Sequence, residues 1–213
     1  MGRPKQLLEW QGKPLLRYVL ENLIHSNADE IILVLGHEAE AIRESLPEFP
    51  VKIVINPDYQ QGMASSLRQG LLAMDPTSEA FLVLLADQPG IGPEIMNRMI
   101  REFQQADPKR GIVRPVYRGL RGHPVLIGVR YLQEALQLQG DVGARQILVN
   151  HPTDILEIEV DHDGILKDID TPEEYQKYMN RAGPRIMTLR QAFSIGKRES
   201  ISLEDPIVIY FNL

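Results

Sequence analysis

The sequence of 213 residues contains no cysteine. This absence excludes disulfide bridges, thiolate zinc sites, iron–sulfur clusters and cysteine nucleophiles. Positive charge is also scarce, because 23 lysines and arginines are set against 29 aspartates and glutamates, which gives a formal net charge of −6. That balance argues against nucleic acid as a partner, although short basic clusters are present.

Long hydrophobic runs are missing too. No apolar stretch approaches the roughly 20 residues of a membrane-spanning helix. The first residues, MGRPKQLLEW, lack the apolar segment of a signal peptide. We therefore expect a cytoplasmic protein without a membrane partner. With 43% hydrophobic residues, the chain has enough apolar material for one domain with a sizeable core.

Short apolar runs alternate with amphipathic stretches in the first half of the chain. Residues 30–36 form a continuous, mostly apolar run that is rich in β-branched residues and ends at a glycine, which is typical of a buried strand. The same pattern predicts strands at 51–56 and 80–86, and the stretches between them predict helices from Pro14, over 38–46, over 64–74 and from Pro93. Buried strands separated by helices predict a Rossmann-like α/β fold, with a mostly parallel sheet and helices on both faces.

The second half is less regular. Strands are predicted at 112–117, 124–127 and 154–160, and helices at 129–138 and 143–149. Thr171-Pro172-Glu173-Glu174 has the capping threonine, N1 proline and third-position glutamate of a helix start. The pattern changes near residues 182–184, so we predict a domain over 1–181 and a C-terminal tail over 182–213.

Two groups of carboxylates could serve a Mg²⁺ site, and the first stands at a strand end, where ligands of such sheets bind. Asp87 ends the most hydrophobic strand, so it is either a Mg²⁺ ligand or the cap of the following turn. Asp168 and Asp170 lie on one face of an extended segment before a helix. Locally, helix capping beside two solvated aspartates is the better interpretation of that segment.

Three further segments carry groups that suit a nucleotide or another anion. Gly2-Arg3-Pro4-Lys5 could bind phosphate, although it lacks the spacing of a Walker loop and a short basic terminus is more often solvated. Residues 62–66 (GMASS) could hold a ribose or base at a helix start, the alternative being a capping serine. Residues 121–124 (RGHP) could meet an anion, the alternative being a surface turn.

Other polar and aromatic residues carry less information. The five histidines show no metal-ligand spacing. We expect Trp10 and Tyr18 to pack rather than to recognise bases.

Seven segments occur in a fixed order along residues 1–181: MGRPKQLL, GKPLL, NPDYQQGMASSLRQGL, LLADQP, RGHPVLI, GDVGAR and DIDTPEEY. This order and spacing resemble the MobA-like nucleotidyltransferases, and within them the molybdenum cofactor cytidylyltransferase (MocA-like) branch. The resemblance implies a fold of the nucleotide-diphospho-sugar transferase type. It implies an enzyme that transfers CMP from CTP to molybdopterin and releases pyrophosphate. The GMASSL segment favours CTP over GTP.

The resemblance also implies roles for matching residues. Lys5, Asp87 and Asp170 would be catalytic, and the two aspartates would hold Mg²⁺. The nucleotide would contact Gly2, Arg3, Lys5, Gly62 and Ser66. The pterin substrate would face Gln88, Arg121 and His123. A molybdenum hydroxylase apoenzyme is a further partner that the resemblance allows. Two alternatives stay open, namely transfer to another phosphorylated acceptor and a non-catalytic cofactor-binding or maturation module.

Both ends of the chain depart from the family pattern. Met1-Gly2 stands where the family's first strand and glycine-rich LAAGxSxRMG loop should end. We therefore expect exposed flanking strands, impaired stability and strongly reduced catalysis. Residues 186–203 more weakly resemble the opening of P-loop accessory proteins of selenium-dependent molybdenum hydroxylases, so the tail could be a remnant of a fused domain.

The last apolar stretch, residues 206–211, has strong strand character. One hypothesis places it in the sheet position of the missing first strand. The interpretation that we favour from the sequence is a disordered or edge-paired tail.

Overall fold

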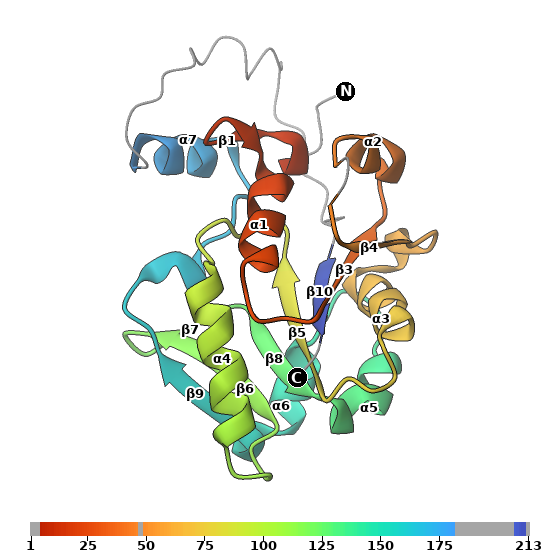
Figure 1. The fold of residues 1–213 in the computed structure, drawn as a ribbon, viewed down its shortest axis with the longest axis vertical. Coiled ribbons are helices and arrows are strands. Elements are labelled where there is room, and N and C mark those ends of the chain that lie inside the picture. The colour runs from red at the N-terminus through yellow and green to blue at the C-terminus, as the bar shows by residue number, and fades with distance from the viewer. Residues whose placement is uncertain (1–4, 47–48, 182–206, 212–213) are drawn as a thin grey trace.

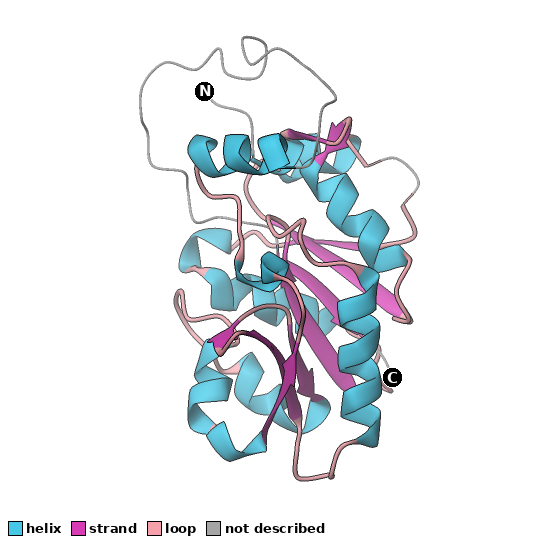
Figure 2. Cartoon of the chain, turned by 90° about the vertical axis from the view of Figure 1, so that its left-hand side faces the viewer, coloured by secondary structure: helices cyan, strands magenta, loops and turns pink. Residues whose placement is uncertain are grey.

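A computed structural model describes residues 5–46, 49–181 and 207–211. One mixed sheet forms the middle of the molecule, and helices lie on both sides of it (Figures 1 and 2). Across the sheet, the strand order is β4 (Lys52–Ile55), β3 (Glu30–Leu35), β10 (Ile207–Phe211), β5 (Ala80–Leu85), β8 (Val125–Gly128), β6 (Ile112–Tyr117) and β7 (Leu120–Arg121), and β9 (Ile155–Glu159) pairs with β6.

Most strands point the same way. The pairings give β3, β4, β5, β6 and β9 one direction, while β7, β8 and β10 run against them. The carboxyl ends of β3, β4 and β5 therefore meet at one edge of the sheet. This arrangement confirms the predicted α/β class and the mostly parallel sheet.

The side chains of the central strands alternate between two cores because successive residues of a strand face opposite sides. Leu33 and Leu35 pack with α1 (Leu15–Ile24), α2 (Ala39–Glu44) and α4 (Pro93–Gln105). Ile32 and Val34 pack on the other face with α3 (Met63–Ala73), α5 (Leu132–Leu136) and α6 (Arg145–Asn150). These fully buried strands explain why their sequences read as continuous apolar runs.

The predicted elements correspond closely to the observed ones, with small corrections. The helix predicted at 129–138 is a 3₁₀ turn, Val129–Tyr131, followed by the shorter α5, and the helix predicted at 143–149 begins two residues later. The predicted helix start at Thr171 is confirmed by α7 (Pro172–Arg181). Within the described part of the chain, no helix has the length and apolar character needed to cross a bilayer.

The tail strand β10 corrects the interpretation that the sequence favoured. It is neither disordered nor at an edge, because its backbone pairs antiparallel with β3 on one side and with β5 on the other. The expected exposure of the flanking strands is wrong for the same reason, since β10 satisfies the backbone groups of both. The strand therefore lies inside the sheet, as the hypothesis requires; that this is the place of the family's first strand stays a prediction. The other tail residues lie outside the described part of the chain.

Candidate active site

The site lies at the edge where β3, β4 and β5 end. Gly36, Asn56 and Asp87 follow these three strands within two residues. Asp87 and Asn56 are buried, with relative exposures of 3% and 1%. Buried polar side chains at a sheet edge need partners, and the surrounding loops supply them.

Lys5 lies between two carboxylates that are far apart in the sequence. Its Nζ is 2.8 Å from Asp87 Oδ2 and 2.8 Å from Asp170 Oδ1. The side chains of Lys5 and Asp87 are 6% and 3% exposed, whereas that of Asp170 is 53% exposed. The second Asp87 oxygen, Oδ1, is buried without a hydrogen-bond partner among the described residues. The carboxylates therefore form a cation-binding pair with acceptor capacity to spare.

Backbone contacts bring the segment of Asp170 to the end of β5. The Ile169 N–H donates to the Asp87 carbonyl at 3.1 Å. Nearby, a Cβ at Gly90 would lie 2.8 Å from Gly164 Cα, and a Cβ at Gly164 would lie 2.3 Å from the Gly90 carbonyl oxygen. Only glycines permit this approach, so the loop after β5 and the turn before Asp168 pack backbone against backbone.

A capping box then fixes the start of α7. The Glu174 carboxylate accepts from the N–H of Thr171 at 2.9 Å and from that of Asp170 at 3.0 Å. The Glu174 N–H donates to the Thr171 hydroxyl at 3.1 Å, as the sequence predicts. Capping and cation pairing therefore occur together, because Thr171 caps the helix while Asp170 reaches Lys5.

The carboxyl groups of Asp87, Asp168 and Asp170 lie close enough to influence one another. Burial raises the pKa of Asp168, and the charges of Asp170 and Asp87 raise it further. The pKa of His123 is lowered because surrounding protein displaces solvent from the imidazole, and the Asp87 charge opposes this shift. His123 is exposed at the surface, and its ring lies close enough to Asp87 for the charge of that carboxylate to act on it.

The three residues predicted to face the acceptor differ in their surroundings. Gln88 is buried, and its Oε1 has no hydrogen-bond partner among the described residues. The backbone N–H of His123 donates to the Ile165 carbonyl at 2.9 Å. Arg121 is exposed and its Nε donates to Glu157 at 3.0 Å, so it is engaged with β9. The structure thus brings His123 and Gln88 close to Asp87, but it does not bring Arg121 to the same cluster.

The predicted nucleoside segment begins α3. The Asn56 amide donates to the hydroxyls of Ser65 at 2.8 Å and Ser66 at 2.9 Å, which ties the end of β4 to this helix. No serine caps the helix, so that alternative is wrong; the N-cap residue is Gly62. The Met63 N–H instead donates to Asp141 Oδ1, at 3.3 Å.

Gly62 and Gly140 join two of the sequence segments into one unit. Gly62 has a φ of +97°, and a Cβ there would lie 2.6 Å from the Gly140 carbonyl carbon. The Ala64 N–H donates to the Gly140 carbonyl at 3.0 Å. The roles of Asn56, Asp141 and Gly140 were not predicted. The segments NPDYQQG and GDVGAR that contain them were the available signal.

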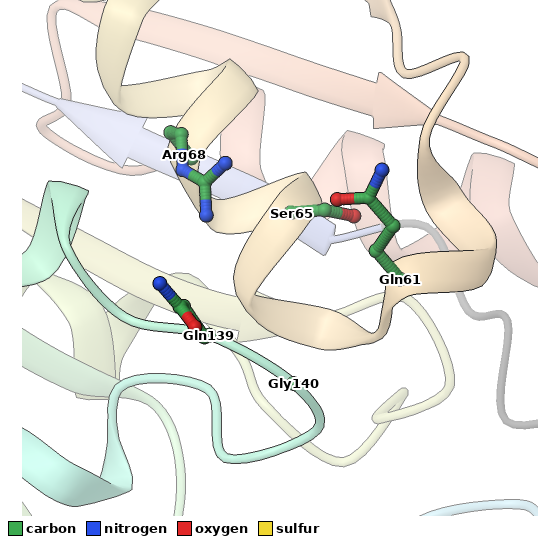
Figure 3. A pocket seen from close by; sticks show the side chains of 5 residues that line it. All are labelled: Gln61, Ser65, Arg68, Gln139 and Gly140. Atoms are coloured by element: carbon green, nitrogen blue, oxygen red, sulfur yellow. The ribbon is translucent and has the colours of Figure 1, made fainter.

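A pocket of about 420 Å³ lies beside this unit (Figure 3). Its lining consists of Gln61, Ser65, Arg68, Gln139 and Gly140. Arg68 donates to the Leu138 carbonyl at 2.9 Å, which connects α3 to the loop after α5. The pocket is polar and adjoins the helix start that was predicted to contact the nucleoside.

The described residues contain no group of three or more histidine, aspartate or glutamate side chains placed to hold a metal ion. Asp87 and Asp170 do converge on one cation, the Lys5 ammonium, and Asp87 Oδ1 retains an unused lone pair. Such a pair fits a Mg²⁺ whose remaining ligands are substrate phosphates and water. Gly2 and Arg3 lie outside the described residues.

Comparison with known proteins places these features in a context. Residues 1–155 match the family described as the MobA-like NTP transferase domain. The chain is 32% identical over 189 residues to the nicotine blue oxidoreductase of Paenarthrobacter nicotinovorans. This match covers 84% of the chain and 90% of the relative. The chain is 29% identical over 176 residues to the molybdenum cofactor cytidylyltransferase of Escherichia coli (strain K12), with 82% and 86% covered.

A solved structure shows the same architecture. The complex of Rv0371c from Mycobacterium tuberculosis H37Rv with manganese superposes with a TM-score of 0.72 at 28% identity, covering 84% of this chain and 94% of that one. The similarity therefore extends over most of both chains.

Proposed function

Since the chain belongs to the MobA-like NTP transferase family and is thereby a nucleotidyltransferase, we propose that it transfers CMP from CTP to molybdopterin and releases pyrophosphate. The observation that carries this proposal is the convergence of Lys5, Asp87 and Asp170 at the carboxyl edge of the sheet. The relative named molybdenum cofactor cytidylyltransferase supports the choice of nucleotide and acceptor.

The proposed roles follow from charge. A triphosphate brings several negative charges to one place, and the reaction needs them neutralised and oriented. Lys5 would bind the phosphates, together with Gly2 and Arg3, while Asp87 and Asp170 would hold Mg²⁺. Bound there, Mg²⁺ would neutralise phosphate charge and fix its geometry.

The remaining predicted residues would surround the two substrates. Gly62 and Ser66 would line the nucleoside site, beside the polar pocket at Ser65 and Arg68. Gln88 and His123 would face the acceptor, with Arg121 farther out. Loss of solvent around the imidazole lowers the pKa of His123, which favours its neutral form, and in that form the ring would hydrogen-bond the acceptor rather than pair with it as a cation.

The chemistry requires no protein base. An acceptor phosphate oxygen, already anionic, forms a bond to the α-phosphorus of CTP. The bond from that phosphorus to the bridging oxygen breaks, and pyrophosphate leaves with the electron pair. Positioning and charge neutralisation by the chain are therefore sufficient.

The first test is a thermal melt with CTP, with GTP and without nucleotide, each with Mg²⁺. At about 100 times Kd, a ligand adds roughly 2.7 kcal/mol, which raises the Tm of a domain of this size by about 5–10 °C. We expect this shift with CTP and a smaller one with GTP. Asp87→Asn should abolish it, whereas Asp29→Asn, at an exposed aspartate before β3 on the opposite edge, should leave it intact.

The second test is turnover. Purified chain, CTP and molybdopterin should yield pyrophosphate and a CMP-bearing pterin detected by mass spectrometry. CTP binding with turnover of a different phosphorylated acceptor would move the chain to another transferase activity. Pterin binding without pyrophosphate would indicate a non-catalytic module. Because one relative is named an oxidoreductase, a parallel assay contains nicotine blue and a nicotinamide reductant; dye reduction without CMP transfer would overturn the proposal.

A further inference from the structure

A small aromatic cluster lies apart from the two main cores. The Trp10 ring is 6.3 Å from that of Tyr18, 6.4 Å from that of Tyr175 and 5.7 Å from that of Tyr178. Leu15 and Ile169 complete this third core at 0% and 1% exposure. Its members come from the hairpin of β1 (Glu9–Trp10) and β2 (Lys13–Pro14), from α1, from α7 and from the segment between η5 (Asp163–Leu166) and α7. Figures 1 and 2 show the hairpin and α7 together at one end of the molecule.

One side of the cluster leads to Lys5. Lys5 begins a 3₁₀ turn, Lys5–Leu7, and its carbonyl accepts from the Leu8 N–H at 3.1 Å. The Leu8 carbonyl accepts in turn from the Leu15 N–H at 2.8 Å, where α1 begins. The turn that bears Lys5 is therefore tied directly to a residue of the cluster.

The other side leads to Asp170. Ile169 is buried in the cluster, and its N–H donates to the Asp87 carbonyl at 3.1 Å. Tyr175 donates its hydroxyl to the Glu9 carbonyl, which joins α7 to the hairpin. The same cluster thus holds both the Lys5 turn and the Asp170 segment, which are 165 residues apart in the chain.

Trp10 contributes to this unit by packing. It is 5% exposed, and its indole N–H has no hydrogen-bond partner among the described residues. The ring is therefore present for its shape and contact area rather than for a polar contact. A smaller residue would leave a space between the hairpin and α7 that the surroundings fill only in part.

We propose that Trp10 and Tyr175 are positioning residues, which set the distance between Lys5 and Asp170 and thereby align the site for the triphosphate. The consequence for turnover rests on the proposed nucleotidyl transfer, whereas the positioning itself does not. A shift of about 1 Å in a reacting group can cost about 10²-fold in rate. Loosening this cluster should therefore lower kcat more than it raises KM for CTP.

The experiment compares Trp10→Leu with Met99→Ala, a buried residue of α4 in a main core. Hydrogen exchange of the Ile169 amide, followed by NMR, reports whether the Asp170 segment stays attached to Asp87. We expect this amide to exchange about tenfold faster in Trp10→Leu and unchanged in Met99→Ala, even where both lower Tm. We also expect kcat to fall at least about tenfold in Trp10→Leu alone, measured well below its Tm, and Trp10→Phe to restore most of it.

The outcomes distinguish the positioning role of the aromatic cluster from the proposed nucleotidyl transfer. An unchanged Ile169 amide in Trp10→Leu overturns the positioning role, whatever the activity. Faster exchange with unchanged kcat overturns its importance for turnover. Faster exchange in a protein whose wild type neither binds CTP nor forms product leaves the positioning established and refutes the proposed function. Should Trp10→Leu fail to fold, Tyr175→Phe, which removes the hydroxyl bond to the Glu9 carbonyl, is measured in the same way, with an expected increase of about threefold.

Discussion

Replacing Lys5 by methionine tests whether the ion pair at the sheet edge determines stability as well as binding. Methionine preserves the length of the side chain and removes its charge. Asp87, at 3% side-chain exposure, would then be left without its cation, while Asp170 at 53% exposure would remain hydrated. The loss is therefore expected to come almost entirely from Asp87.

The magnitude follows from this burial. Removing one partner of a buried ion pair costs about 3–5 kcal/mol, because the remaining charge keeps its desolvation penalty. For a chain of this size the corresponding fall in Tm is about 10 °C. Adding Asp87→Asn to Lys5→Met removes the stranded charge, so the double variant should be more stable than Lys5→Met alone. Mg²⁺ should also stabilise Lys5→Met, since a cation can take the place of the ammonium.

The assay is thermal and urea denaturation of the four proteins of this cycle, with and without Mg²⁺. Lys109→Met, at an exposed lysine in the loop after α4, is the matched control and should change stability by less than about 0.5 kcal/mol. A Tm for Lys5→Met within about 2 °C of the wild type would refute the reasoning. So would a double variant less stable than Lys5→Met.

Three further predictions concern other parts of the fold. Ile209 pairs with Ile32 and Val83 in the sheet. Ile209→Pro removes a ladder N–H and leaves its acceptor unpaired, so it should cost about 1–3 kcal/mol in urea denaturation, whereas Ile209→Val should remain near wild type. Gly62→Ala should destabilise the protein more than Gly140→Ala. Both glycines have a positive φ, which costs an alanine about 1 kcal/mol, but of these two positions only Gly62 would bring a Cβ against neighbouring backbone. Calorimetry should therefore give the lower Tm for Gly62→Ala. The Tyr131 hydroxyl donates to Asp154 and holds the pKa of that carboxyl below its ordinary value. A carboxyl whose pKa is lower in the folded than in the unfolded protein stabilises the fold at pH values above its unfolded-state pKa, and this contribution is lost as the pH falls through its folded-state pKa. Tyr131→Phe should therefore raise the Asp154 pKa in a carbon-13 NMR titration. It should also reduce the loss of folding free energy that accompanies acidification below about pH 4.

The strands could be predicted from the sequence because burial on both faces leaves a direct trace. Residues 31–35 and 80–86 are apolar without interruption, and the structure packs them between two helix layers. The position of Asp87 was predictable for the same reason, since it directly follows such a run. The family resemblance then indicated Lys5 and Asp170 as site residues, because no local pattern connects these two positions.

The contacts between distant segments could not be predicted from local patterns. Asp170 precedes a well-formed capping box, and its neighbours alone indicate a solvated residue. Its approach to Lys5 depends on the aromatic cluster at Trp10 and on the close packing of Gly90 against Gly164. Neither has a periodic signature, because each joins residues whose separation in the chain is arbitrary.

The position of the tail strand in the sheet could not be predicted from the sequence either. A short apolar run such as residues 207–211 indicates extended backbone, but a central strand and an edge strand of this length look alike in sequence. Its place is decided by β3 and β5, each of which has backbone groups to satisfy on the side that faces the other. Its direction matters for function. Ile207 pairs with Leu85, near Asp87, whereas Phe211 pairs with Phe81 at the far end of β5. The carboxyl end of β10 therefore points away from the site, and the strand completes the sheet without adding a loop after its carboxyl end to the edge where Lys5 meets Asp87.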